Sequence, residues 1–225
     1  MTERTDALIA ELARGLPKVE RLPELRRVAA IVVGVGLGLA AINSVAGVFV
    51  KEHFPKPDFG AVDEWTLLAH ALLAGGALAF ALGACVPGRE PLARGGAWTI
   101  ALALVVLAGV GMARIGAWPG VASVEATWLE RTIGCSLSCL LPGIVPAVLL
   151  TRFTARAAPR RAALVLGVGA VASLALLSAP GVIGCEYPDQ LHHALSHSFV
   201  PLLGGLVMWA ALLPLYLMLR PAPAA

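Results

Sequence analysis

The chain has 225 residues, of which 58% are hydrophobic and 14% are charged, with a formal net charge of +3. A soluble domain carries about 25% charged residues, so the composition indicates a membrane protein and excludes an ordinary soluble one. The weak positive charge does not support direct binding of nucleic acid. The four cysteines lie on or beside apolar segments, which excludes the disulfide framework of a small secreted protein.

The first segment, residues 1–27, is charged and amphipathic, so we expect no cleavable signal peptide. Leu8, Ile9 and Leu12 share one face of a predicted short helix, and Leu16 continues the apolar pattern. A helix of this length is marginal alone in water. Its apolar face must therefore be buried, either on the bilayer surface or in the groove of a cytoplasmic protein.

Six apolar segments follow, and each is close to the roughly 20 residues that a helix needs to cross a bilayer. They lie at residues 28–50, 65–86, 97–118, 134–151, 162–183 and 197–219. Their hydrophobicity is continuous rather than alternating, which favours helices over a barrel. The predicted fold is therefore all-α and polytopic. It has a short N-terminal cytoplasmic helix within residues 1–27, six transmembrane helices in 28–219 and a C-terminal tail at 220–225.

The distribution of basic residues predicts the orientation. With the N-terminus inside, only Lys51, Lys56, Arg114 and Arg131 fall on the outer side, and the other 13 of the 17 basic residues fall inside. This bias follows the positive-inside rule and predicts cytoplasmic termini. We expect Arg114, near an outer helix end, to extend its charge to the interface. The spans hold no evident chain of acids or bases, which counts against an ion pump or ion-coupled transporter.

Cysteine and histidine gather on the predicted outer side. Cys135 opens the fourth span, and Cys185 lies in the loop after the fifth. His193 and His197 are spaced i, i+4 and so share one helix face, whereas His192 is expected to point elsewhere. Thiols and imidazoles bind soft or borderline metals, and the outer compartment also permits disulfides. Cys135 and Cys185 are therefore candidate redox or metal sensors, and His193 and His197 candidate metal ligands, with no cofactor assigned with certainty.

Other functions remain open at this point. A membrane metal-binding or metal-transport protein, or a thiol-redox protein, could use the same residues, although no C-x-x-C motif is present. A structural or assembly role is a third alternative. No catalytic constellation is evident, so we do not expect an enzyme. We expect Cys85 and Cys139 to serve only in packing.

One family resemblance covers nearly the whole chain. Residues 8–27, LIAELARGLPKVERLPELRR, resemble the start of NrsF-type membrane-embedded anti-sigma factors of bacteria. The similarity extends to the six spans, the arginine-rich loop RFTARAAPRR at 152–161 and three short motifs. These motifs are Gly134–Cys135, Gly184–Cys185 with a following histidine segment that includes His193, and Gly204–Gly205.

The resemblance implies a function. The cytoplasmic tail of such a protein holds an extracytoplasmic-function sigma factor at the inner membrane, away from RNA polymerase. On this chain the contact would be made by Leu8, Ile9, Leu12 and Leu16. An outer signal sensed by Cys135 and Cys185 would release the sigma factor. The extra histidines are not part of the resemblance and leave open whether the signal is a metal or an oxidant.

Overall fold

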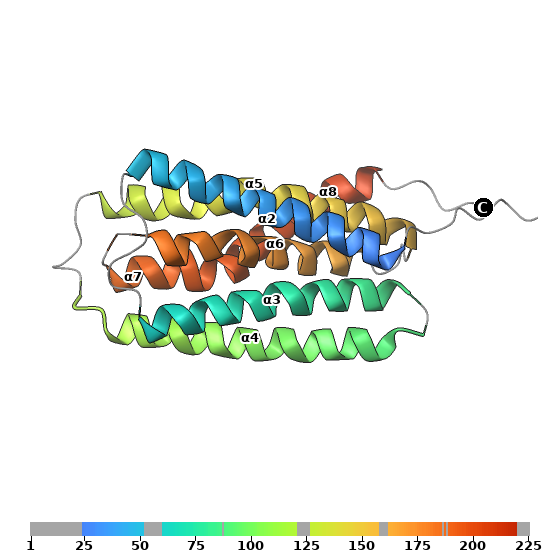
Figure 1. The fold of residues 1–225 in the computed structure, drawn as a ribbon, viewed down its shortest axis with the longest axis horizontal. Coiled ribbons are helices and arrows are strands. Elements are labelled where there is room, and N and C mark those ends of the chain that lie inside the picture. The colour runs from blue at the N-terminus through green and yellow to red at the C-terminus, as the bar shows by residue number, and fades with distance from the viewer. Residues whose placement is uncertain are drawn as a thin grey trace, which may run out of the picture.

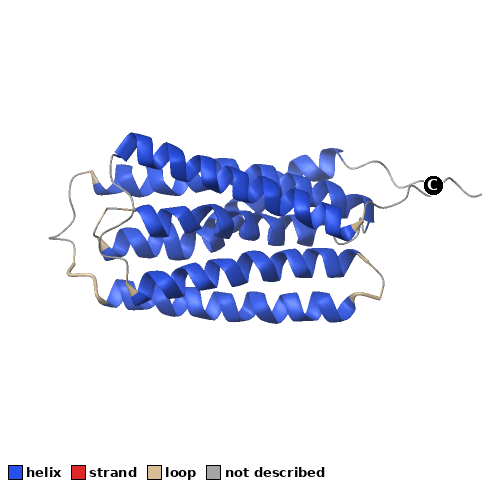
Figure 2. Ribbon diagram, viewed as in Figure 1, coloured by secondary structure: helices blue, strands red, loops and turns tan. Residues whose placement is uncertain are grey.

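The computed structural model describes residues 24–51, 60–86, 88–120, 127–157, 162–185, 187 and 189–219. All regular secondary structure in these ranges is helical (Figure 2). This confirms the predicted all-helical class. The predicted partner contacts at Leu8, Ile9, Leu12 and Leu16 lie outside the described residues.

The helices follow one another along the described chain with short connections. In order they are α2 (Leu25–Lys51), α3 (Ala61–Cys85), α4 (Glu90–Gly116), α5 (Trp128–Ala157), α6 (Ala162–Gly184), α7 (Gln190–His193), the π-helical segment η2 (Ala194–Phe199) and α8 (Val200–Leu219). Five stretches are long and apolar enough to cross a membrane: Ala61–Cys85, Glu90–Gly116, Trp128–Phe153, Ala163–Ile183 and Gln190–Met218. Helix α2 covers the first predicted span, and its crossing of the membrane stays a prediction.

The helices extend beyond the predicted apolar segments because polar residues begin several of them. At the start of α3, the Gly60 amide donates a hydrogen bond to the Asp63 carboxylate at 3.2 Å, which satisfies one of the unpaired groups of the first turn. Helix α5 continues through Pro142 and Pro146. The fourth span is therefore a full-length helix in spite of its two prolines.

The long helices form an elongated bundle in which successive elements run in opposite directions (Figure 1). Helix α2 begins and α8 ends at one end of the bundle, which we call the tail end. The opposite end, where α3 and α5 begin and α7 lies, is called the site end. Helix α6 is central and contacts α2, α3, α5 and α8. Since residues 24 and 219 lie at the same end, the two termini leave the bundle on the same side.

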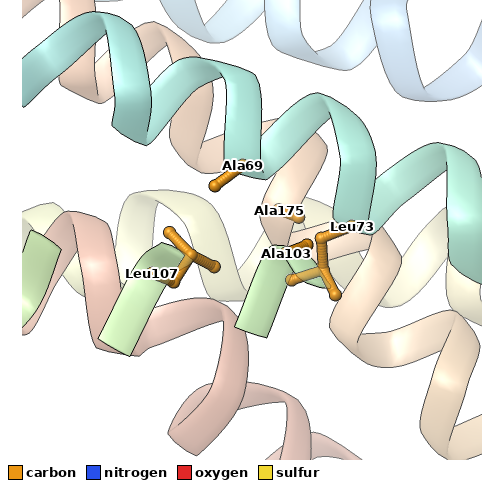
Figure 3. Close-up of a cluster of buried hydrophobic side chains, with 5 residues drawn as sticks. All are labelled: Ala69, Leu73, Ala103, Leu107 and Ala175. Carbon is orange, nitrogen blue, oxygen red and sulfur yellow. The ribbon is translucent and has the colours of Figure 1, made fainter. Parts of the chain in front are cut away.

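Small side chains bring α3 close to α4. A core of fully buried residues joins these two helices to α6 (Figure 3), and it consists of Ala69, Leu73, Ala103, Leu107 and Ala175. Nearby, a Cβ atom on Gly96 would meet the carbonyl oxygen of Gly76 at 2.6 Å. Because only glycine fits at this distance, the backbones approach closely, as is typical of helix pairs in membranes.

The outside of the bundle is apolar over much of its length. Trp98, Val105 and Met218 are 77%, 70% and 82% exposed, respectively. Large apolar surfaces of this kind are rare on soluble monomers. A surrounding bilayer would account for them, and five stretches of the described chain are long and apolar enough to cross one.

Candidate metal centre

Two thiols and two imidazoles converge at the site end of the bundle. Cys135 lies in the second turn of α5, Cys185 directly follows α6, His192 belongs to α7 and His197 to η2. One ligand atom from each residue lies within 4.8 Å of those from all the others. We call these four residues the thiol–imidazole cluster.

The cluster consists of two close sulfur–nitrogen pairs. The Sγ atom of Cys185 lies 3.2 Å from Nε2 of His192, and Sγ of Cys135 lies 3.6 Å from Nε2 of His197. The chain carries four cysteines, and none of them forms a disulfide in this structure. Cys135 and Cys185, which are separated by an entire helix in the sequence, thus lie together as reduced side chains.

The histidine pair differs from the sequence expectation. The predicted pair was His193 and His197, but the ligand atoms that join the cysteines belong to His192 and His197. Between these two histidines lies the π-helical segment Ala194–Phe199, whose i→i+5 hydrogen bonds make a wider turn than those of an α-helix. His193 is also fully buried, and its ring lies 5.2 Å from that of His197. His193 therefore packs beside the cluster without contributing to it.

A second layer of contacts orients the ring of His192. Its Nδ1 atom lies 3.0 Å from the Thr132 hydroxyl, which leaves Nε2 directed at Cys185. The ring of Tyr187 meets that of His192 edge to face at 5.1 Å, and Arg131 lies over Tyr187 at 5.0 Å. Tyr187 and His192 are 9% and 1% exposed, so these contacts cover the site and shield it from solvent.

The surroundings of Cys185 favour its thiolate form. Hydrogen bonds to Cys135 and to the imidazoles of His192 and His197 lower the pKa of the Cys185 thiol, and burial opposes them. A thiolate is the form that coordinates metals and attacks oxidants. The site therefore provides a reactive sulfur in a largely closed environment.

The position of His197 depends on a glycine of α6. A Cβ atom on Gly181 would meet Cε1 of His197 at 2.6 Å and Nδ1 at 2.9 Å. A residue larger than glycine at position 181 would leave no room for the His197 ring. His70 of α3 is also fully buried next to His197, and its Nδ1 atom donates to the Thr66 carbonyl at 2.6 Å.

A buried ion pair lies beside the cluster, which the sequence did not predict. Arg114 was expected to extend to the interface, but its side chain is 3% exposed and donates from Nη2 to Oδ1 of Asp63 at 2.6 Å. Its Nη1 atom donates to Oε1 of Gln190, the first residue of α7, at 3.3 Å. The expectation was wrong because Asp63 offers a partner in the interior, 51 residues away in sequence. The pair links α3 and α4 to the helix that carries His192.

The remaining cysteines lie in apolar surroundings, as expected. Cys139 is 1% exposed, packs with Ala40, Leu177 and Val200, and donates to the Leu177 carbonyl at 3.5 Å. Cys85 is 3% exposed at the other end of the bundle. Neither belongs to the thiol–imidazole cluster.

Comparison of the chain with protein-family models, curated proteins and solved structures finds no match. The chemistry of the site thus follows from its own donor atoms. Two thiols and two imidazoles can hold a soft or borderline metal ion, and two neighbouring thiols can be oxidised to a disulfide. Metal binding would use all four members of the cluster, whereas disulfide formation would use only Cys135 and Cys185.

Proposed function

We propose that the protein is a membrane-bound anti-sigma factor of the bacterial inner membrane. Its tail, residues 1–27, would hold an extracytoplasmic-function sigma factor in the cytosol through Leu8, Ile9, Leu12 and Leu16. The thiol–imidazole cluster would face the outer side and sense a metal ion or an oxidant. On this proposal the protein binds no nucleic acid itself and acts by withholding the sigma factor from RNA polymerase.

One observation carries the sensing part of the proposal. The cysteines implicated by the family resemblance, Cys135 and Cys185, lie in one buried cluster with ligand atoms within 4.8 Å. The cluster lies at the site end, opposite the end where α2 begins (Figure 1). A receptor at one end and an effector segment at the other is the arrangement that a transmembrane signal requires. The positive-inside bias assigns the tail end to the cytosol.

The path between the two ends runs along helices that share the cluster. Cys135 belongs to α5, and Cys185 follows α6, which contacts α2 along the bundle. A metal or a disulfide that ties these two residues together would shift the balance between two arrangements of the bundle. Because α2 continues directly from the tail, such a shift would change how the tail presents its apolar face.

The test uses the full-length protein in membranes, incubated with a cytoplasmic extract of the organism that encodes it. We expect the wild type to retain a sigma factor, identified by mass spectrometry, and to release it after treatment with Zn²⁺, Cd²⁺ or a thiol oxidant. Replacing Leu8 and Leu12 with Asp should abolish retention, because a charge cannot enter an apolar groove. Glu11→Ala, on the polar face of the same helix, is the matched control.

The two halves of the proposal fail separately. Retention that persists after the Leu8→Asp/Leu12→Asp change would contradict the tail contact. A response to metal and oxidant that is unchanged in the Cys135→Ser/Cys185→Ser variant would contradict the sensor. Cys139→Ser, a buried cysteine outside the cluster, is the control for the second variant.

A further inference from the structure

The thiol–imidazole cluster has the donor set and spacing of a closed metal site. Bonds of about 2.3 Å to sulfur and 2.0 Å to nitrogen place two ligands of a tetrahedral Zn²⁺ about 3.3–3.8 Å apart. The two sulfur–nitrogen distances, 3.2 Å and 3.6 Å, already lie near this range. All other separations are within 4.8 Å. Contraction by about 1.5 Å at most would therefore complete the tetrahedron.

The contacts around His192 are also those of a metal ligand, whereas Nδ1 of His197 is buried without a hydrogen-bond partner among the described residues. Ligating histidines almost always place their other nitrogen on an oxygen, which fixes the ring and its tautomer. Nδ1 of His192 lies 3.0 Å from Thr132 Oγ1, and the Thr132 carbonyl accepts hydrogen bonds from the hydroxyls of Ser136 and Ser196. The bond from Ser196 therefore ties η2 to α5 at Thr132. The ring of His192 is therefore already held in the orientation in which Nε2 can bind a metal.

Charge and burial together select the class of ion. Two thiolates and two neutral imidazoles carry a charge of −2, which a divalent ion cancels, whereas a monovalent ion would leave a net charge in a buried site. Of the acids at this end of the bundle, Asp63 is already paired with Arg114, and Asp189 caps α7 by accepting from the Leu191 amide. Thiolate ligands favour Zn²⁺ and Cd²⁺ over Mg²⁺, Ca²⁺ and Mn²⁺. Four protein ligands also leave no open position for substrate, which is typical of a structural or sensing site.

The π-helical segment determines which histidine takes part. In a regular α-helix, residues five apart point about 140° away from each other, so His192 would leave the cluster and His193 would pair with His197. The π turn at Ala194–Phe199 interrupts this regular spacing, and His192, rather than His193, supplies a ligand atom that joins the thiols. Such turns are frequent at functional sites.

We propose that Cys135, Cys185, His192 and His197 form a closed, four-coordinate site for a divalent ion of the Zn²⁺ class, in which the π-helical segment selects His192 over His193. This inference deepens the sensing role proposed above and rests on the same site. It does not require a sigma factor. A failure of sigma retention would leave the metal site intact, and a failure of metal binding would leave retention by the tail intact.

The test is Co²⁺ titration of the purified, reduced, full-length protein in detergent. We expect one Co²⁺ per chain, with the intense visible absorption of a tetrahedral ion and a thiolate charge-transfer band, and full displacement by Zn²⁺. His192→Ala should weaken Zn²⁺ binding by more than the roughly 10- to 100-fold typical of a lost second-layer contact. His193→Ala is the matched control, because it is buried to the same extent and differs only in its place in the turn.

A further variant separates lost binding from lost folding. His192→Cys should restore tight binding with a stronger thiolate band, since cysteine supplies the missing ligand. The proposal would be overturned by weak, octahedral-type Co²⁺ absorption or by a His192→Ala variant that binds Zn²⁺ as the wild type does. It would equally be overturned if His193→Ala, rather than His192→Ala, abolished binding.

Discussion

The buried pair of Asp63 and Arg114 gives the sharpest prediction on stability. The two side chains are 6% and 3% exposed, and their charged atoms lie 2.6 Å apart. Replacing Arg114 with Met leaves the Asp63 carboxylate buried without its counter-charge. Removal of one partner from a buried pair costs about 3–5 kcal/mol, whereas replacement of both with neutral groups is close to neutral. We therefore expect Arg114→Met to lower the free energy of unfolding by about 3–5 kcal/mol and Asp63→Asn/Arg114→Met to recover most of this loss.

The assay is SDS-induced unfolding of the purified protein in mixed micelles, followed by far-UV circular dichroism. Arg94→Met removes the same charge from an exposed position on the same helix and should change stability by less than about 0.5 kcal/mol. Because Arg114 also donates to Gln190 at the start of α7, we expect Arg114→Met to weaken Zn²⁺ binding as well. A double variant as unstable as Arg114→Met, or an Arg114→Met variant as stable as Arg94→Met, would refute the reasoning.

Three further predictions concern the metal site. Gly181→Ala places a methyl group 2.6 Å from the His197 ring and should weaken Zn²⁺ binding by about 1–3 kcal/mol. Gly134→Ala, the control, has no neighbour within 4 Å and should leave Zn²⁺ binding unchanged. Competition with a chromophoric chelator measures the affinity of both variants. Thr132→Val removes the oxygen next to His192 Nδ1 and should weaken Zn²⁺ binding about 10- to 100-fold in the same competition assay. Zn²⁺ at 100 times its Kd should raise the free energy of unfolding by about 2.7 kcal/mol, and a chelator such as EDTA should reverse the gain, as followed by circular dichroism.

Hydropathy was sufficient to predict the helical class and the approximate positions of the spans, because continuous apolar segments have few alternatives in a membrane. It placed the helix starts too late, since polar residues such as Asp63 and Glu90 belong to the first turns of α3 and α4. The membrane crossing of the first predicted span, in α2, the cytosolic side of the tail and the sigma-factor contact remain predictions.

The candidate site could be predicted only in part. Cys135, Cys185 and His197, which the sequence singled out, lie together in the thiol–imidazole cluster, and their roles as sensors or metal ligands stay predictions. The rings of the predicted pair, His193 and His197, lie 5.2 Å apart as the i, i+4 spacing implies, but the imidazoles whose ligand atoms join the two thiols are those of His192 and His197, which the spacing alone does not reveal. The burial of Arg114 was missed for a similar reason, since its partner lies on another helix.

X-ray absorption at the zinc edge tests the central claim most directly. On the Zn²⁺-loaded, full-length protein we predict two sulfur ligands at about 2.3 Å and two imidazole nitrogens at about 2.0 Å, with one nitrogen lost in His192→Ala. A first shell of oxygen and nitrogen alone, or one that keeps both imidazoles in His192→Ala, would contradict the account.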